Sequence, residues 1–131
     1  MSILDSFLGA KPAVEITEEV FIKRLGDSIT IKALTGEDID QIRDQATYPV
    51  KNGKKTELKV NEEEVSRLLI VKATVEPNFA DKQLLEYYKA SDAGDCVQKA
   101  LLAGEIAHIQ TAVLSLSGFN DEDDEIDEVK N

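Results

Sequence analysis

The longest hydrophobic pattern of the chain lies in residues 101–119, which read LLAGEIAHIQTAVLSLSGF. Its apolar residues recur at intervals of four, three, four and three positions, namely Leu102, Ile106, Ile109, Val113 and Leu116. This spacing places all five on one stripe of an α-helix, and Gly118 suits the turn that ends a helix because glycine accepts a left-handed conformation. The stripe predicts a core helix. The alternative is a helix that also supplies a partner-binding edge.

In the first half of the chain the period of the hydrophobic pattern shifts towards two residues, which is typical of β-strands. Val20 and Ile22 precede a Gly26-Asp27 turn, and apolar and polar residues alternate again after it. This predicts a β-hairpin.

A second hairpin is predicted around Asn52-Gly53, because both residues tolerate the positive φ of a tight type I′ turn. Such a turn places Tyr48 and Val50 opposite Leu58 and Val60. The segment carries the only basic cluster of the chain, which consists of Lys51, Lys54, Lys55 and Lys59. We interpret these lysines as protection of an exposed edge strand. The alternative is a docking patch for an acidic partner, including the chain's own C-terminal tail.

Polar capping residues mark the expected helix starts. Thr35 and Asp38 form a variant of the capping box and open a helix between the two hairpins. Three more helices are predicted to follow the N-cap residues Asn61, Asp81 and Asp92. Residues 75–79 are expected to form an extended connector, and Gly104 is expected to separate the last of these helices from the helix of residues 101–119.

These patterns together predict an α+β fold: two β-hairpins and a helix, followed by a helical C-terminal half. We expect residues 15–119 to form a single domain in which the hairpins pack on the helical half. The predicted core includes Leu68, Leu69, Ile106, Ile109 and Val113.

The two ends of the chain are expected to lie outside this domain. Residues 1–14 are expected to be a flexible or docking segment, because a short amphipathic helix before Pro12 is marginal by itself. Residues 120–131 hold seven Asp and Glu residues against Lys130, so they contribute −6 to the net charge of −11. Such self-repulsion with little apolar surface predicts a disordered acidic tail.

Charge and composition also limit the cellular context. A net negative surface disfavours binding to nucleic acid or to an anionic membrane. The single cysteine, Cys96, cannot form an internal disulfide, and the first residues lack the pattern of a signal peptide. No apolar run approaches the roughly 20 residues of a membrane span, so we expect a cytoplasmic protein.

Candidate catalytic and metal-binding residues are few. His108 and Cys96 are each the only residue of their type, whereas a structural zinc site needs four nitrogen or sulfur ligands. The acids of the tail fail as a calcium loop, because Ile126 occupies the position that requires glycine. No glycine-rich phosphate loop is present. The sequence therefore predicts a protein that is not an enzyme and has no cofactor or metal.

The order of these features resembles that of the XkdN-like phage tail assembly chaperones of Gram-positive bacteria and their prophages. The resemblance lies in ITIKALTGEDIDQIR, LLIVKATVEPNFADKQLLEYY and ALLAGEIAHIQTAVLSLSGF, followed by an acidic end that closes in EVKN. It implies a non-catalytic protein that binds the tape measure protein, helps tail tube subunits to assemble and is absent from the finished virion. Self-association is a further expectation.

The candidate partner-binding residues lie on two apolar segments, and they are Ile3, Leu4, Phe7, Leu102, Ile106, Ile109, Val113, Leu116 and Phe119. Two other functions stay open from the sequence. One is an acidic decoy that inhibits a DNA-binding protein, and the other is a structural subunit of the tail.

Overall fold

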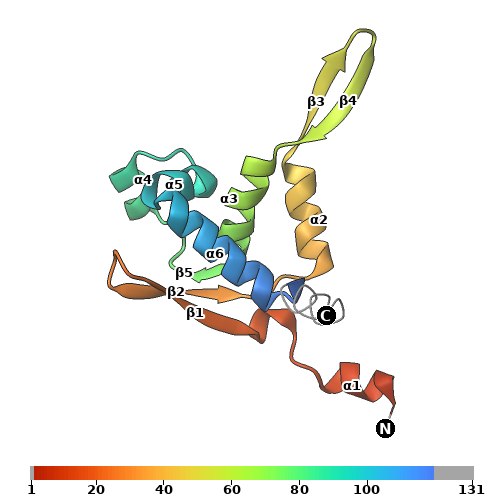
Figure 1. The fold of residues 1–131 in the computed structure, drawn as a ribbon, viewed down its shortest axis with the longest axis vertical. Coiled ribbons are helices and arrows are strands. Elements are labelled where there is room, and N and C mark those ends of the chain that lie inside the picture. The colour runs from red at the N-terminus through yellow and green to blue at the C-terminus, as the bar shows by residue number, and fades with distance from the viewer. Residues whose placement is uncertain (1, 120–131) are drawn as a thin grey trace, which may run out of the picture.

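A computed structural model describes residues 2–119 of the chain (Figure 1). In chain order its elements are α1 (Ile3–Gly9), the 3₁₀ helix η1 (Ala13–Glu15), β1 (Thr17–Ile22), β2 (Asp27–Lys32), α2 (Gly36–Gln45), β3 (Thr47–Asn52), β4 (Lys55–Val60), α3 (Glu62–Ala73), β5 (Thr74–Glu76), α4 (Lys82–Tyr88), α5 (Ala93–Ala100) and α6 (Ala103–Leu116). Two hairpins and a helix precede a mainly helical C-terminal half, so the predicted α+β class is confirmed.

The first hairpin, β1–β2, belongs to an antiparallel sheet with strand order β1-β2-β5. Val20 lies opposite Ile29, and both are buried together with Ile22 and Ile31. Because side chains alternate between the two faces of a strand, these four residues form one apolar face that packs on the helices. Part of the predicted connector, residues 75–76, belongs instead to the strand β5.

Helix α3 lies at the centre of the helical half, where it packs against α2, α5 and α6 (Figure 1). Leu69 on α3 is buried, and Ile109 and Val113 on α6 have no exposed surface, which confirms these three as core residues. Leu68 and Ile106 are half-buried and pack against the same cluster. Helix α6 also packs against β1 and β2, so the apolar stripe joins the sheet to the helices.

The capping residues act as the sequence predicts. The Thr35 hydroxyl accepts a hydrogen bond from the N–H of Asp38, whose carboxylate accepts one from the N–H of Thr35. Side chains of Asn61, Asp81 and Asp92 accept backbone hydrogen bonds at the starts of α3, α4 and α5. These bonds satisfy N–H groups that have no partner inside the helix.

The boundary between α5 and α6 differs from the prediction. The break falls at Leu101 and Leu102, which have extended backbone conformations. Gly104 lies inside the first turn of α6 rather than at the break. The Glu105 carboxylate accepts a hydrogen bond from the N–H of Leu102, and this contact starts the new helix at Ala103.

The second hairpin, which we call the basic ribbon (residues 47–60), differs from the prediction in its turn and in its packing. The two-residue loop is Gly53-Lys54, and only Gly53 has positive φ, so the type I′ turn at Asn52-Gly53 was wrong. Tyr48 therefore pairs with Lys59, and Pro49 pairs with Leu58. This register places Tyr48 and Val50 on one face and Leu58 and Val60 on the other. No residue of either strand is buried. The ribbon instead projects from the end of α2 (Figure 1).

The segment before the sheet also projects from the body. Helix α1 is closed at its start by a reciprocal pair of hydrogen bonds between Ser2 and Asp5, and it has no buried residue. The acidic tail, residues 120–131, lies outside the described residues. Within residues 2–119, none of the helices has the length and apolar composition needed to cross a membrane.

Candidate partner-binding surfaces

Helix α1 exposes four neighbouring apolar residues. Ile3, Leu4, Phe7 and Leu8 each have between 63% and 76% of their surface exposed. Because they are spaced by one, three and one positions, they occupy one side of the helix. Burial of a large apolar side chain stabilises a complex by about 1.5–3 kcal/mol. Helix α1 therefore presents a compact apolar face to a partner.

Helix α6 offers less surface than its stripe suggests. Ile109 and Val113 have no exposed surface, and Ile106 and Leu116 are half-buried. Leu102 before the helix and Phe119 after it are 58% and 48% exposed. A partner that leaves the fold intact therefore meets mainly Leu102 and Phe119. The partner-binding role of the whole set stays a prediction.

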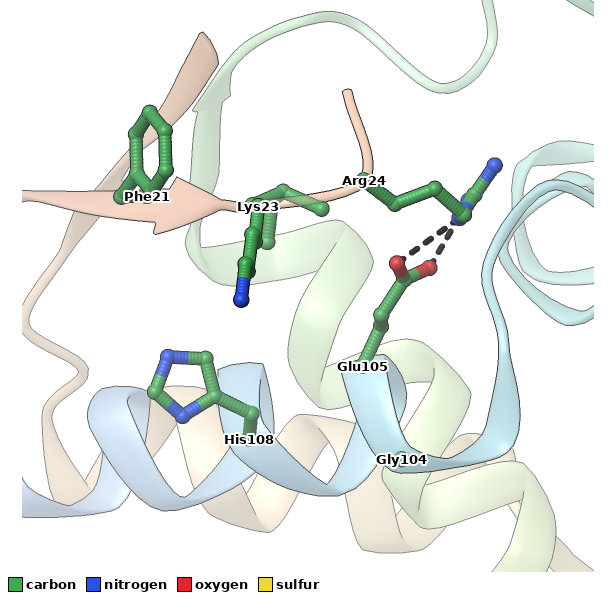
Figure 2. Close-up of a pocket in the computed structure, with 7 residues that line it drawn as sticks. Phe21, Lys23, Arg24, Gly104, Glu105 and His108 are labelled. Atoms are coloured by element: carbon green, nitrogen blue, oxygen red, sulfur yellow. Dashed lines mark hydrogen bonds and ion pairs between the residues drawn. The ribbon is translucent and has the colours of Figure 1, made fainter. Parts of the chain in front are cut away.

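A cavity of about 650 Å³ opens between the end of β1 and the first turns of α6 (Figure 2). The residues lining it are Phe21, Ile22, Lys23, Arg24, Gly104, Glu105 and His108. Figure 2 shows the side chains of Lys23 and His108 pointing toward one another across the opening. The sequence gives no signal for this cavity, because its two walls lie about 80 positions apart in the chain.

One wall of the cavity is held by an ion pair between Arg24 and Glu105. Nε and Nη2 of Arg24 each donate to a different carboxylate oxygen of Glu105, at 2.8 Å in both cases, and Nη2 also donates to the carbonyl oxygen of Ala100 at 3.1 Å. The Arg24 guanidinium and the N–H of Leu102 together lower the pKa of Glu105 to about 2. The pair therefore joins the β1–β2 turn to the start of α6, and the carboxylate is a structural anion rather than a proton donor.

The only cysteine of the chain is poorly placed to act as a nucleophile. Cys96 is fully buried on α5, and burial raises the pKa of its thiol. A buried thiol with a raised pKa is a poor nucleophile, because the thiolate is the reactive form. Among residues 2–119, no group of three His, Cys, Asp or Glu side chains is arranged to hold a metal ion.

Comparison with known families assigns the chain to a group of assembly proteins. Residues 4–130 match the family described as phage XkdN-like tail assembly chaperone protein, TAC. The chain belongs to this family. The resemblance seen in the sequence is therefore confirmed, and it extends over almost the whole chain. The description of the family names a role in tail assembly and no catalysed reaction.

Two curated relatives of this family member come from Bacillus subtilis (strain 168). The uncharacterized protein YqbN is 28% identical over 112 residues, which cover 82% of this chain and 75% of YqbN. The phage-like element PBSX protein XkdN is 24% identical over 112 residues, which cover 82% of this chain and 76% of XkdN. A crystal structure of YqbN superposes with a TM-score of 0.58 at 25% identity, and covers 79% of this chain and 87% of YqbN. The α+β fold is thus shared with YqbN.

The ion pair at Glu105 gives this family member a pH-dependent stability. A folded pKa of about 2 lies below the ordinary carboxyl pKa of about 4.3. The unfolded chain therefore takes up the proton first, so the stabilisation is complete above about pH 4.3 and is lost as the pH falls toward 2.

We expect Glu105→Gln to lower the urea midpoint at neutral pH and to show a smaller further loss between about pH 4.3 and pH 2 than the wild type. Glu86→Gln, at an exposed position on α4, is the matched control and should follow the wild type. Parallel losses for Glu105→Gln and the wild type across this range would contradict the assignment of the low pKa to Glu105.

Proposed function

We propose that the chain binds the tape measure protein of a phage or prophage tail and keeps it soluble until tail tube subunits assemble around it. The observation that carries this proposal is the apolar face of α1, which a member of a tail assembly chaperone family exposes on a projecting segment. A tape measure protein is a long, largely helical and apolar-rich chain. An amphipathic helix can bind such a chain by packing apolar faces together.

The charge of the protein supports the proposal that it keeps the tape measure protein soluble. The net charge of −11 makes a complex coated with several copies strongly anionic, and like-charged complexes repel one another. The apolar face of α1 supplies the contact, and the acidic surface keeps the complex dispersed. This chaperone acts in the cytoplasm of the bacterial host and leaves before the virion is complete.

Co-expression with the tape measure protein of the phage or prophage that encodes this chain tests the proposal. We expect a large share of the tape measure protein to stay in the soluble fraction and to co-purify with this chain, and to sediment when it is expressed alone. Equal insolubility with and without this chain would refute the proposal. Detection of the chain in purified tails would favour the structural-subunit alternative.

A further inference from the structure

The basic ribbon is an unusual element for a protein of this charge. Among residues 2–119 its strands pair only with one another, and residues 51–59 are all exposed. Figure 1 shows the ribbon standing away from the sheet and from the helices. An isolated two-stranded hairpin is marginally stable in water. A projecting hairpin of this kind therefore gains most from a bound partner.

The positive charge of the ribbon indicates that its partner is anionic. Its four lysines and Glu57 give a net charge of +3, within a chain of net charge −11. No carboxylate of residues 2–119 lies within ion-pair distance of these lysines. Lysines along strand edges also discourage the addition of another strand. The ribbon therefore favours an anionic segment held by its side chains over a strand held by backbone hydrogen bonds.

We infer that the basic ribbon of one copy binds the acidic tail, residues 120–131, of a second copy of this chain. The tail carries a net charge of −6 and the ribbon +3, so the two are complementary. The tail also contains Ile126 and Val129, and the ribbon exposes Leu58 at 73%, which adds an apolar contact to the ionic ones.

The geometry of the chain favours a tail that comes from another copy. The N–H of Leu34 donates to the Ser117 hydroxyl at 2.9 Å, which fixes the end of α6 beside the start of α2. The ribbon begins at the other end of α2 (Figure 1). Helix α2 has ten residues and is about 15 Å long at ~1.5 Å per residue. Strand β3 has six residues and adds about 20 Å at ~3.3 Å per residue.

The tail is too short to cover this distance with most of its acids. Glu128, the last of them, is nine residues beyond Phe119 and reaches about 30 Å only when every residue is fully extended, at ~3.3 Å per residue. Asp124 reaches about 17 Å on the same scale. The lysines at the tip of the ribbon, Lys54 and Lys55, lie about 35 Å from the end of α6 on these scales. They therefore lie beyond most of the acids of their own chain, even when the lengths of the side chains are added. The tail of a second copy does not start beside α2 of this copy, so this distance limit does not apply to it.

This contact joins two different surfaces, a ribbon on one copy and a tail on the next. In such a heterologous contact, a pair of copies still has a free ribbon on one copy and a free tail on the other. Further copies can therefore add, and the assembly either closes into a ring or grows as an open chain. The contact does not depend on the proposed binding of a tape measure protein, and self-association can be measured with this chain alone.

The experiment uses three full-length variants and sedimentation velocity at low and at high salt. The ribbon variant is Lys54→Glu/Lys55→Glu. The tail variant converts the seven carboxylates of the tail to amides: Asp121→Asn, Glu122→Gln, Asp123→Asn, Asp124→Asn, Glu125→Gln, Asp127→Asn and Glu128→Gln. The matched control is Lys11→Glu/Lys82→Glu, which makes the same charge change at exposed lysines outside the ribbon.

We expect the wild type and the control to self-associate at low salt and to dissociate as salt screens the charges. The ribbon and tail variants should each associate at least about tenfold more weakly, since the first reverses two of the four lysine charges and the second removes all seven carboxylate charges. A mixture of these two variants should form a complex of one copy of each, because one supplies an intact tail and the other an intact ribbon.

Three results would overturn the inference. They are a wild type that stays monomeric at low salt, a ribbon variant that associates as the wild type does, and a mixture of variants that forms no complex. Circular dichroism of each variant checks that the body is folded. The substituted lysines are exposed, so their replacement should leave the spectrum unchanged.

Discussion

Replacement of Ile109 by alanine is expected to lower the free energy of unfolding by about 2–5 kcal/mol. The Ile109 side chain has no exposed surface and lies in the same core cluster as Ile70 on α3 and Val97 on α5. The substitution removes buried methyl and methylene groups and leaves a cavity that close-packed neighbours fill only in part. Because a domain of this size is stable by only about 5–15 kcal/mol, one substitution removes a large share of its stability.

Urea unfolding followed by circular dichroism measures this effect. The matched control is Ile3→Ala, the same chemical change at a residue that is 74% exposed on α1. The control should change the free energy of unfolding by less than about 0.5 kcal/mol. Equal effects at the two positions would mean that Ile109 is not part of the core.

Local rules predicted the starts of α2, α3, α4 and α5 correctly. The capping contacts of Thr35, Asn61, Asp81 and Asp92 each join residues no more than three positions apart. Such contacts depend only on the order of residues in the sequence. The stripe of α6 was equally readable, because five apolar residues at helical spacing leave little alternative.

Features that depend on long-range contacts were not predictable in this way. Strand β5 is only three residues long and exists because β2 offers it an edge. The register of the basic ribbon was wrong by one position at its turn, because no buried face fixes the register there. The cavity beside α6 depends on Arg24 and Glu105, which are 81 positions apart. Periodicity carries no information about such a pair.

The same limit applies to the candidate partner-binding residues. The sequence placed the apolar residues of α1 and of α6 in one set, because both have helical spacing. The structure separates them by burial: Ile3, Leu4 and Phe7 are exposed, whereas Ile109 and Val113 lie in the core. Burial follows from how α6 sits between the sheet and α3, which a single pattern does not reveal.

The apolar face of α1 and the basic ribbon differ in how they respond to salt. Apolar burial persists when ionic strength rises, whereas attraction between exposed charges is screened over about 10 Å at 0.1 M salt. Binding to a tape measure protein through α1 and association between copies through the ribbon can therefore be separated in one series of salt concentrations.

The triple substitution Ile3→Ser/Leu4→Ser/Phe7→Ser is expected to abolish binding of the tape measure protein without weakening the fold. None of the three side chains is buried in the isolated protein, so the thermal melt should coincide with that of the wild type. Each loses about 1.5–3 kcal/mol of apolar burial in the complex, so the affinity should fall at least about a hundredfold. The share of co-expressed tape measure protein that co-purifies at high salt measures this fall without a contribution from the ribbon.

The matched control replaces three exposed apolar residues elsewhere, in the variant Leu25→Ser/Leu58→Ser/Val75→Ser. These residues are 52%, 73% and 53% exposed, so the control removes a comparable amount of exposed apolar surface from the body and the ribbon. It should bind the tape measure protein as the wild type does. Loss of binding in the control with retention in the α1 variant would move the contact from α1 to the body or the ribbon. Because both variants start from exposed side chains, a difference between them reports the location of the contact and not the stability of the fold.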